Sequence, residues 1–78
     1  MNATQLTNAA RLLAHFANNI TVNIDNAKAY QFWSARYFAA KEMLYICSGI
    51  EATIVKSENG NVTIKLTDSK TYNFTFEN

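Results

Sequence analysis

The side chains best suited to chemistry in this sequence are one cysteine, Cys47, and one histidine, His15. A thiol and an imidazole can act as nucleophile and base when a fold brings them within hydrogen-bonding distance. No motif links the two, and a cysteine near the end of an apolar helix is usually a small core residue. We therefore expect no catalytic residues and no enzyme activity.

Metal and cofactor sites are not indicated either. One histidine and one cysteine cannot supply the three or four ligands of a typical metal centre. The acidic residues show no paired arrangement for acid–base work; they are Asp25, Glu42, Glu51, Glu58, Asp68 and Glu77. Neither glycine belongs to a phosphate-binding loop. We expect no metal-binding and no cofactor-binding residues.

Basic residues on the predicted helices could bind nucleic acid. The candidate contacts are Arg11, Lys28, Arg36 and Lys41. The net charge of +1 is small for a polyanion-binding domain. RNA-binding sheets stack bases on exposed aromatic side chains, whereas the pattern here places Tyr72, Phe74 and Phe76 on the buried face. Nucleic-acid binding is therefore the alternative hypothesis.

Length and composition predict one small packed domain covering residues 1–78. Apolar residues make up 49% of the chain, and it has two glycines and no proline. The single cysteine excludes an internal disulfide, and small domains without such a staple commonly associate, so we expect a homodimer. With no export signal and no apolar run of about 20 residues, we expect a soluble cytoplasmic protein that does not enter membranes.

The first third of the chain predicts a helix followed by a strand. Apolar residues at helical spacing run from about Ala3 to Asn18, with Asn2 as the N-cap paired with Gln5. The pair Asn18-Asn19 is a plausible stop signal. The segment Ile20 to Ile24 then alternates between apolar and polar residues, which favours a short strand at a sheet edge.

A long helix is predicted from Ala27 to Ser48, capped by Asp25 or Asn26 and ended by Gly49. Its apolar residues form two stripes. The first stripe holds Tyr30, Trp33, Tyr37, Ala40, Leu44 and Cys47; the second stripe holds Phe32, Ala35, Ala39, Met43 and Ile46. A helix that is apolar on most sides is normally buried on most sides.

After Gly49 the apolar period changes to two, which predicts a three-stranded antiparallel meander. Two registers are open for the first hairpin. A two-residue loop would pair Ser57 with Val62. A three-residue loop ending at a left-handed Gly60 instead pairs Ile54 with Ile64 and Lys56 with Val62, and keeps Ile54 inward. We favour the second register, and by the same counting a turn at Asp68-Ser69-Lys70 pairs Leu66 with Tyr72.

These elements give an α+β fold in the order α-β-α-β-β-β, with the long central helix packed on the C-terminal three-stranded meander. A small sheet covers only part of such a helix, so some of its rings should stay exposed. The predicted interaction surface consists of Tyr30, Trp33, Tyr37 and Phe38.

The functional hypothesis is a small, non-catalytic protein-interaction module that blocks a surface of a larger protein. By size and character it is comparable to the inhibitors that phages and mobile elements make against host machinery, including anti-CRISPR proteins. Its expected partners are a larger protein target and a second copy of itself. Nucleic-acid binding through the basic helix residues remains the alternative.

Overall fold

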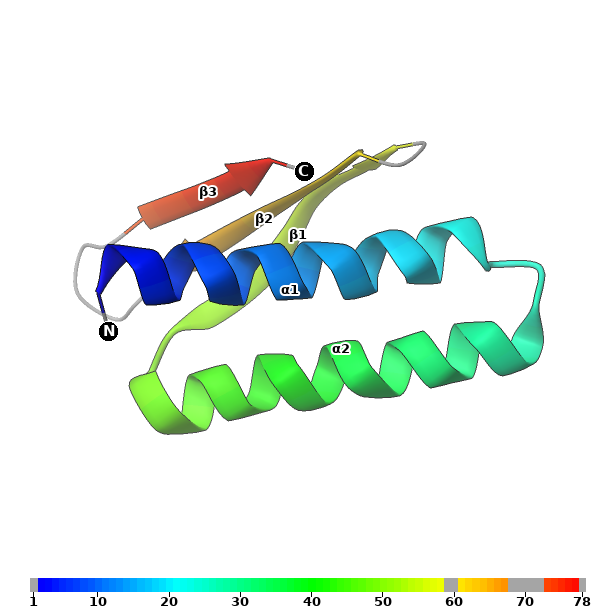
Figure 1. Cartoon of the computed structure of the whole chain (residues 1–78), viewed down its shortest axis with the longest axis horizontal. Helices are drawn as coiled ribbons and strands as arrows, with labels where there is room; N and C mark the ends of the chain where they lie inside the picture. The colour runs from blue at the N-terminus through cyan, green and yellow to red at the C-terminus, as the bar shows by residue number, and fades with distance from the viewer. Residues whose placement is uncertain (1, 59–60, 68–72, 78) are drawn as a thin grey trace.

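The computed structural model describes residues 2–58, 61–67 and 73–77, with side chains over 2–56 and 62–67. Two helices, α1 (Ala3–Val22) and α2 (Ala27–Ser48), precede three strands. The strands are β1 (Glu51–Glu58), β2 (Asn61–Thr67) and β3 (Asn73–Glu77), in the sheet order β1-β2-β3 (Figure 1). The α+β class is confirmed, and the observed element order is α-α-β-β-β.

Helix α1 begins as predicted but runs further than predicted. The Asn2 side chain accepts a hydrogen bond from the Gln5 backbone N–H at 2.8 Å, and the Gln5 side chain accepts one from the Asn2 backbone N–H at 3.0 Å. This capping box satisfies two N–H groups that a helix start leaves without partners. The helix then continues to Val22, so the predicted stop at Asn18-Asn19 and the strand at Ile20–Ile24 are wrong.

Packing and local hydrogen bonds both explain the longer helix. Ile20 follows Leu13 by seven residues and Phe16 by four, so a helix keeps it on the same face, where it packs against the core. The polar residues of this segment bond back along the helix: Asn19 Nδ2 donates to the His15 carbonyl and Asn23 Nδ2 to the Asn19 carbonyl, both at 2.8 Å. The alternating pattern was therefore a misleading strand signal.

Helix α2 has the bounds that the sequence predicts. Asn26, not Asp25, is the N-cap, and its side chain accepts a hydrogen bond from the Ala29 backbone N–H at 3.1 Å. At the other end Gly49 adopts the left-handed conformation with φ +70° and donates its N–H to the Tyr45 carbonyl at 2.8 Å. Local hydrogen bonds therefore set both ends of this helix.

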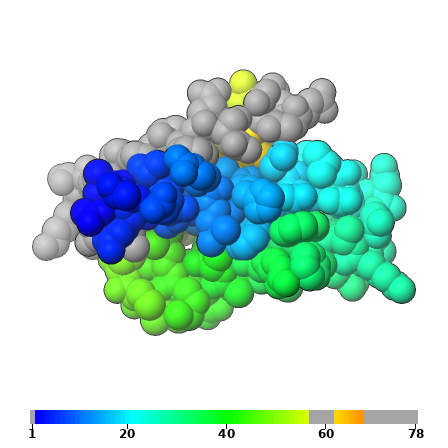
Figure 2. Space-filling model, viewed as in Figure 1, coloured from blue at the N-terminus to red at the C-terminus, as the bar shows by residue number. Residues whose placement is uncertain are grey.

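The order of the layers differs from the prediction. Helix α1 contacts α2 and all three strands, whereas α2, within the described residues, contacts α1 and β1 alone. The two helices lie antiparallel and side by side, with α1 between α2 and the sheet (Figures 1 and 2). The expectation that the long helix lies across the sheet is therefore wrong.

Small side chains explain why α1 takes the middle position. Ala10, Ala14 and Ala17 are almost completely buried in α1. They belong to one core cluster with the sheet residues Val62, Ile64 and Leu66, each fully buried. Alanines let a helix approach a sheet closely, whereas α2 carries bulky residues around most of its circumference.

The β1–β2 hairpin combines both predicted registers. Ile54 pairs with Ile64 as we favoured, but Lys56 pairs with Thr63 and Ser57 with Val62, because a bulge lies between Ile54 and Lys56. The predicted pairing of Lys56 with Val62 is therefore wrong. One extra residue in β1 at the bulge therefore changes the favoured register into the alternative one towards the hairpin end. Ile54 is 39% exposed, so the prediction that it faces inward is wrong.

The β2–β3 pairing is shifted by two residues from the prediction. Leu66 pairs with Phe74, and Ile64 with Phe76. The predicted partner of Leu66, Tyr72, lies outside the described residues, as do the turn at 68–70 and the predicted left-handed Gly60.

Candidate interaction surface

The first stripe of α2 faces α1. Tyr37 and Leu44 are buried, with exposed fractions of 3% and 8%, and Ala40 packs against the core cluster. Trp33 is half-buried at the same helix–helix contact, where its ring centroid lies 6.0 Å from that of Phe16 and 5.6 Å from that of His15. Most of this stripe therefore serves the core of the chain itself.

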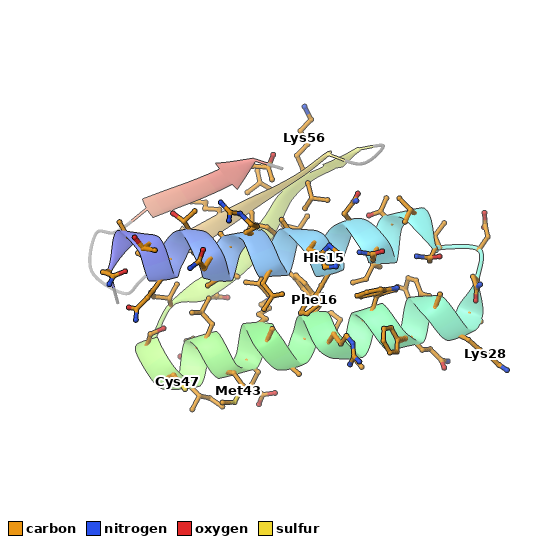
Figure 3. The ribbon with its side chains drawn as sticks, in the orientation of Figure 1. His15, Phe16, Lys28, Met43, Cys47 and Lys56 are labelled. Carbon is orange, nitrogen blue, oxygen red and sulfur yellow. The ribbon has the colours of Figure 1, made fainter. Side chains whose placement is uncertain are left out.

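The second stripe faces solvent. We call its five residues the outer face of α2: Phe32, Ala35, Ala39, Met43 and Ile46, all of which are exposed. The exposed fractions are 47% for Phe32, 58% for Met43 and 66% for Ile46. In Figure 3, Met43 lies on the side of α2 turned away from α1. The outer face is thus an apolar surface whose large side chains are exposed, and its alanines Ala35 and Ala39 line a shallow depression with Phe16 of α1.

The outer face continues onto its two flanks. On one side Leu12 of α1, which is 48% exposed, lines a shallow depression between the helices together with Ala40 and Met43. On the other side Phe38 and Tyr45 stand in solvent, with exposed fractions of 61% and 58%. They line an open pocket of about 420 Å³ whose other lining residues are Lys41, Glu42 and Glu51.

The predicted surface residues do not form one exposed patch. Phe38 is exposed and Tyr30 is 42% exposed, whereas Trp33 is half-buried and Tyr37 lies in the core. The Tyr37 and Phe38 rings meet edge to face with centroids 5.3 Å apart, so the two mark the boundary between core and surface. The residues that the prediction missed are Phe32, Met43 and Ile46, although the second stripe already contained them.

The basic residues do not converge on one surface. At 100° per residue, Lys28, Arg36 and Lys41 point to three different sides of α2, and Arg11 lies on the exposed side of α1. The Arg36 guanidinium stacks on the Phe32 ring, with its central carbon 3.9 Å from the ring centroid. That arginine therefore shields one edge of the outer face, in a cation–π contact.

Cys47 and His15 do not meet. His15 contacts Trp33, and Cys47 follows Trp33 by fourteen residues on the same helix, which corresponds to about 21 Å. Figure 3 shows Cys47 near one end of α2 and His15 in the middle of α1. The two side chains cannot act as a nucleophile–base pair in this arrangement.

Other classes of site find no support in the part of the chain that the structure describes. Within it, no group of three His, Cys, Asp or Glu side chains is placed to hold a metal ion. Neither described helix combines the length and apolar character needed to span a membrane. No protein family model, curated protein or solved structure matches the chain significantly.

Proposed function

We propose that this chain is a non-catalytic protein-interaction module that works through the apolar surface of α2. The observation that supports this proposal is the exposed outer face, which lies on a helix whose contacts within the described residues are α1 and β1 alone. The largest exposed apolar patch of a small protein is often its binding site.

The area involved is large enough to contribute to binding. The exposed parts of Phe32, Met43 and Ile46 together amount to roughly 300 Å², given about 150–250 Å² for a whole large side chain. At ~25 cal/mol per Å², their burial would contribute about 7 kcal/mol before the cost of association. That gain is comparable to the lower estimates of the cost, so Phe38, Tyr45 and Leu12 on the flanks would be needed as well.

We further propose that the chain acts by occupying a surface of a larger protein inside the cell, as an inhibitor of the kind that phages and mobile elements produce. The support is its size, its lack of a chemistry-bearing cluster among the described residues and its exposed apolar helix. Nucleic-acid binding is supported less well, since the basic residues of α2 point to different sides.

Site-specific photo-crosslinking in extract of the source cell tests this proposal. A photoreactive residue replaces Phe38 at the flank of the outer face, and a matched control replaces Asn8, which is exposed on α1. We expect a discrete adduct with a different protein from position 38 only, and we expect Tyr45→Ala to weaken it. Equal labelling from positions 38 and 8, or labelling unaffected by Tyr45→Ala, would contradict the proposal.

A further inference from the structure

The residues of the outer face of α2 are spaced symmetrically about one central position. Ala39 stands at the centre, with Ala35 and Met43 four positions before and after it, and Phe32 and Ile46 seven positions before and after it. We infer from this symmetry that the outer face is covered by a second copy of the chain, with the two α2 helices antiparallel and a twofold axis at Ala39. This inference rests on the proposed function, because both assign binding to the apolar surface of α2.

The antiparallel arrangement pairs large side chains with small ones. Ala39 of one copy meets Ala39 of the second copy, and each Met43 lies over Ala35 of the other copy. Phe32 then meets Ile46 on both sides, as an isologous contact requires. Phe32, Ala39 and Ile46 recur every seven residues, the period of helices that cross at about 20° and pack side chains between one another.

A parallel arrangement of the same face is less favourable. It would place each residue against the same residue of the second copy. Met43 would then meet Met43, while the facing alanines would leave gaps between the helices. Lys28 lies on the same side of α2 as Ile46, eighteen residues or five turns earlier, so a parallel pair would bring the two Lys28 ammonium groups together. The antiparallel arrangement avoids both problems.

The charges at the ends of α2 complement each other in the antiparallel pair. The last turn of α2 has no basic residue to interact with its terminal carbonyl groups. With the axis at Ala39, Lys28 of one copy reaches the C-terminal end of α2 in the other copy, where the helix dipole is negative. Figure 3 shows Lys28 extending from the N-terminal end of α2, free of α1. Each copy would thus supply the cation that the other lacks.

The surface available is consistent with a small stable interface. The exposed parts of the three large outer-face residues and of Leu12, Phe38 and Tyr45 amount to roughly 600 Å² in one copy. Stable interfaces bury about 600–1,000 Å² on each partner. The dimer reaches this size only if it also buries the flanking residues, which would form the rim of the interface.

Cysteine crosslinking distinguishes the possible arrangements. In a Cys47→Ser background, Ala39→Cys should form a disulfide-linked dimer under mild oxidation, because facing Cα atoms at a close helix crossing are within disulfide range. Ala35→Cys alone should not, since the two substituted positions would be about 12 Å apart along the axis. The double variant with Ala35→Cys and Met43→Cys should crosslink again.

Each other outcome overturns the inference. Efficient crosslinking of both single variants would indicate a parallel pair, and crosslinking no better than that of Asn8→Cys would indicate that no such dimer forms. Sedimentation equilibrium supplies the second readout: we expect twice the chain mass of 8.8 kDa. Met43→Glu should raise the dimer dissociation constant at least about a hundredfold, because it buries two unpaired carboxylates.

The two proposals fail separately. A chain that is monomeric but still forms the adduct from position 38 retains the proposed function and loses the dimer. A chain that dimerises through Ala39 but forms no adduct with a different protein retains the dimer and loses the larger target.

Discussion

Tyr37 shows how a single ring divides the core of this protein from its surface. It is buried against α1, while its neighbour Phe38 stands in solvent. Burial raises the pKa of the Tyr37 phenol above its ordinary value of 10.0, because desolvation disfavours the charged phenolate. The unfolded chain therefore releases this proton at a lower pH than the folded chain does.

This difference in pKa predicts that the free energy of unfolding decreases at alkaline pH. The contribution of Tyr37 to the free energy of unfolding is fully present below pH 10 and is lost as the pH rises through the folded-state pKa. Urea unfolding at about pH 9 and about pH 11 gives the free energy of unfolding at each pH. Its decrease between the two pH values should be smaller for Tyr37→Phe than for the wild type. Tyr45→Phe is the control, since Tyr45 is 58% exposed. Identical losses in the wild type and in Tyr37→Phe would contradict this assignment.

The interaction residues were the part of the site that sequence could predict least well. Both stripes of α2 are apolar, and periodicity does not state which stripe faces the rest of the chain. The prediction chose large rings for the exposed surface, yet two of them, Trp33 and Tyr37, pack on the side of α2 that faces α1. Of the predicted set, Phe38 and Tyr30 are exposed, and Tyr37 is buried.

At the scale of the elements, local signals fixed the ends that carry caps. The limits of α2 follow from Asn26 and Gly49, and the start of α1 from Asn2 and Gln5. Helix α1 instead runs through Asn18-Asn19, its predicted stop signal, to a C-cap at Asn23. The last turns of α1 depend on the packing of Ile20 against the core. This tertiary contact cannot be predicted from the alternation of apolar and polar residues between Ile20 and Ile24.

The cap at Gly49 can be tested by substitution. Its φ of +70° disfavours residues with a Cβ. Among the described residues, no other atom lies within 4 Å of a Cβ added at this position. Gly49→Ala should therefore lower the free energy of unfolding by about 1 kcal/mol through backbone strain alone. Gly49→Asn should cost less, because asparagine tolerates this conformation. Equal costs for both substitutions, measured by urea unfolding, would argue against a left-handed cap.

At the scale of the whole molecule, the main consequence follows from the position of α1. The sequence predicted the α+β class, but it did not reveal which helix contacts the sheet. The signal was present in Ala10, Ala14 and Ala17, whose small side chains permit a close approach on that side of α1. With α1 in the middle, α2 becomes the outermost layer, and no described strand packs on its second stripe.

Thiol labelling at Ala39 tests most directly whether the outer face lies outside the core of the chain. The experiment uses a Cys47→Ser background. In dilute solution the thiol of Ala39→Cys should be labelled at a rate within about tenfold of its rate in urea. Raising the protein concentration should slow this labelling, because the dimer buries the thiol. Ala14→Cys, at a fully buried position, should be protected at least about a hundredfold at every concentration. Equal protection of both thiols in dilute, folded protein would contradict the exposed outer face on which both proposals rest.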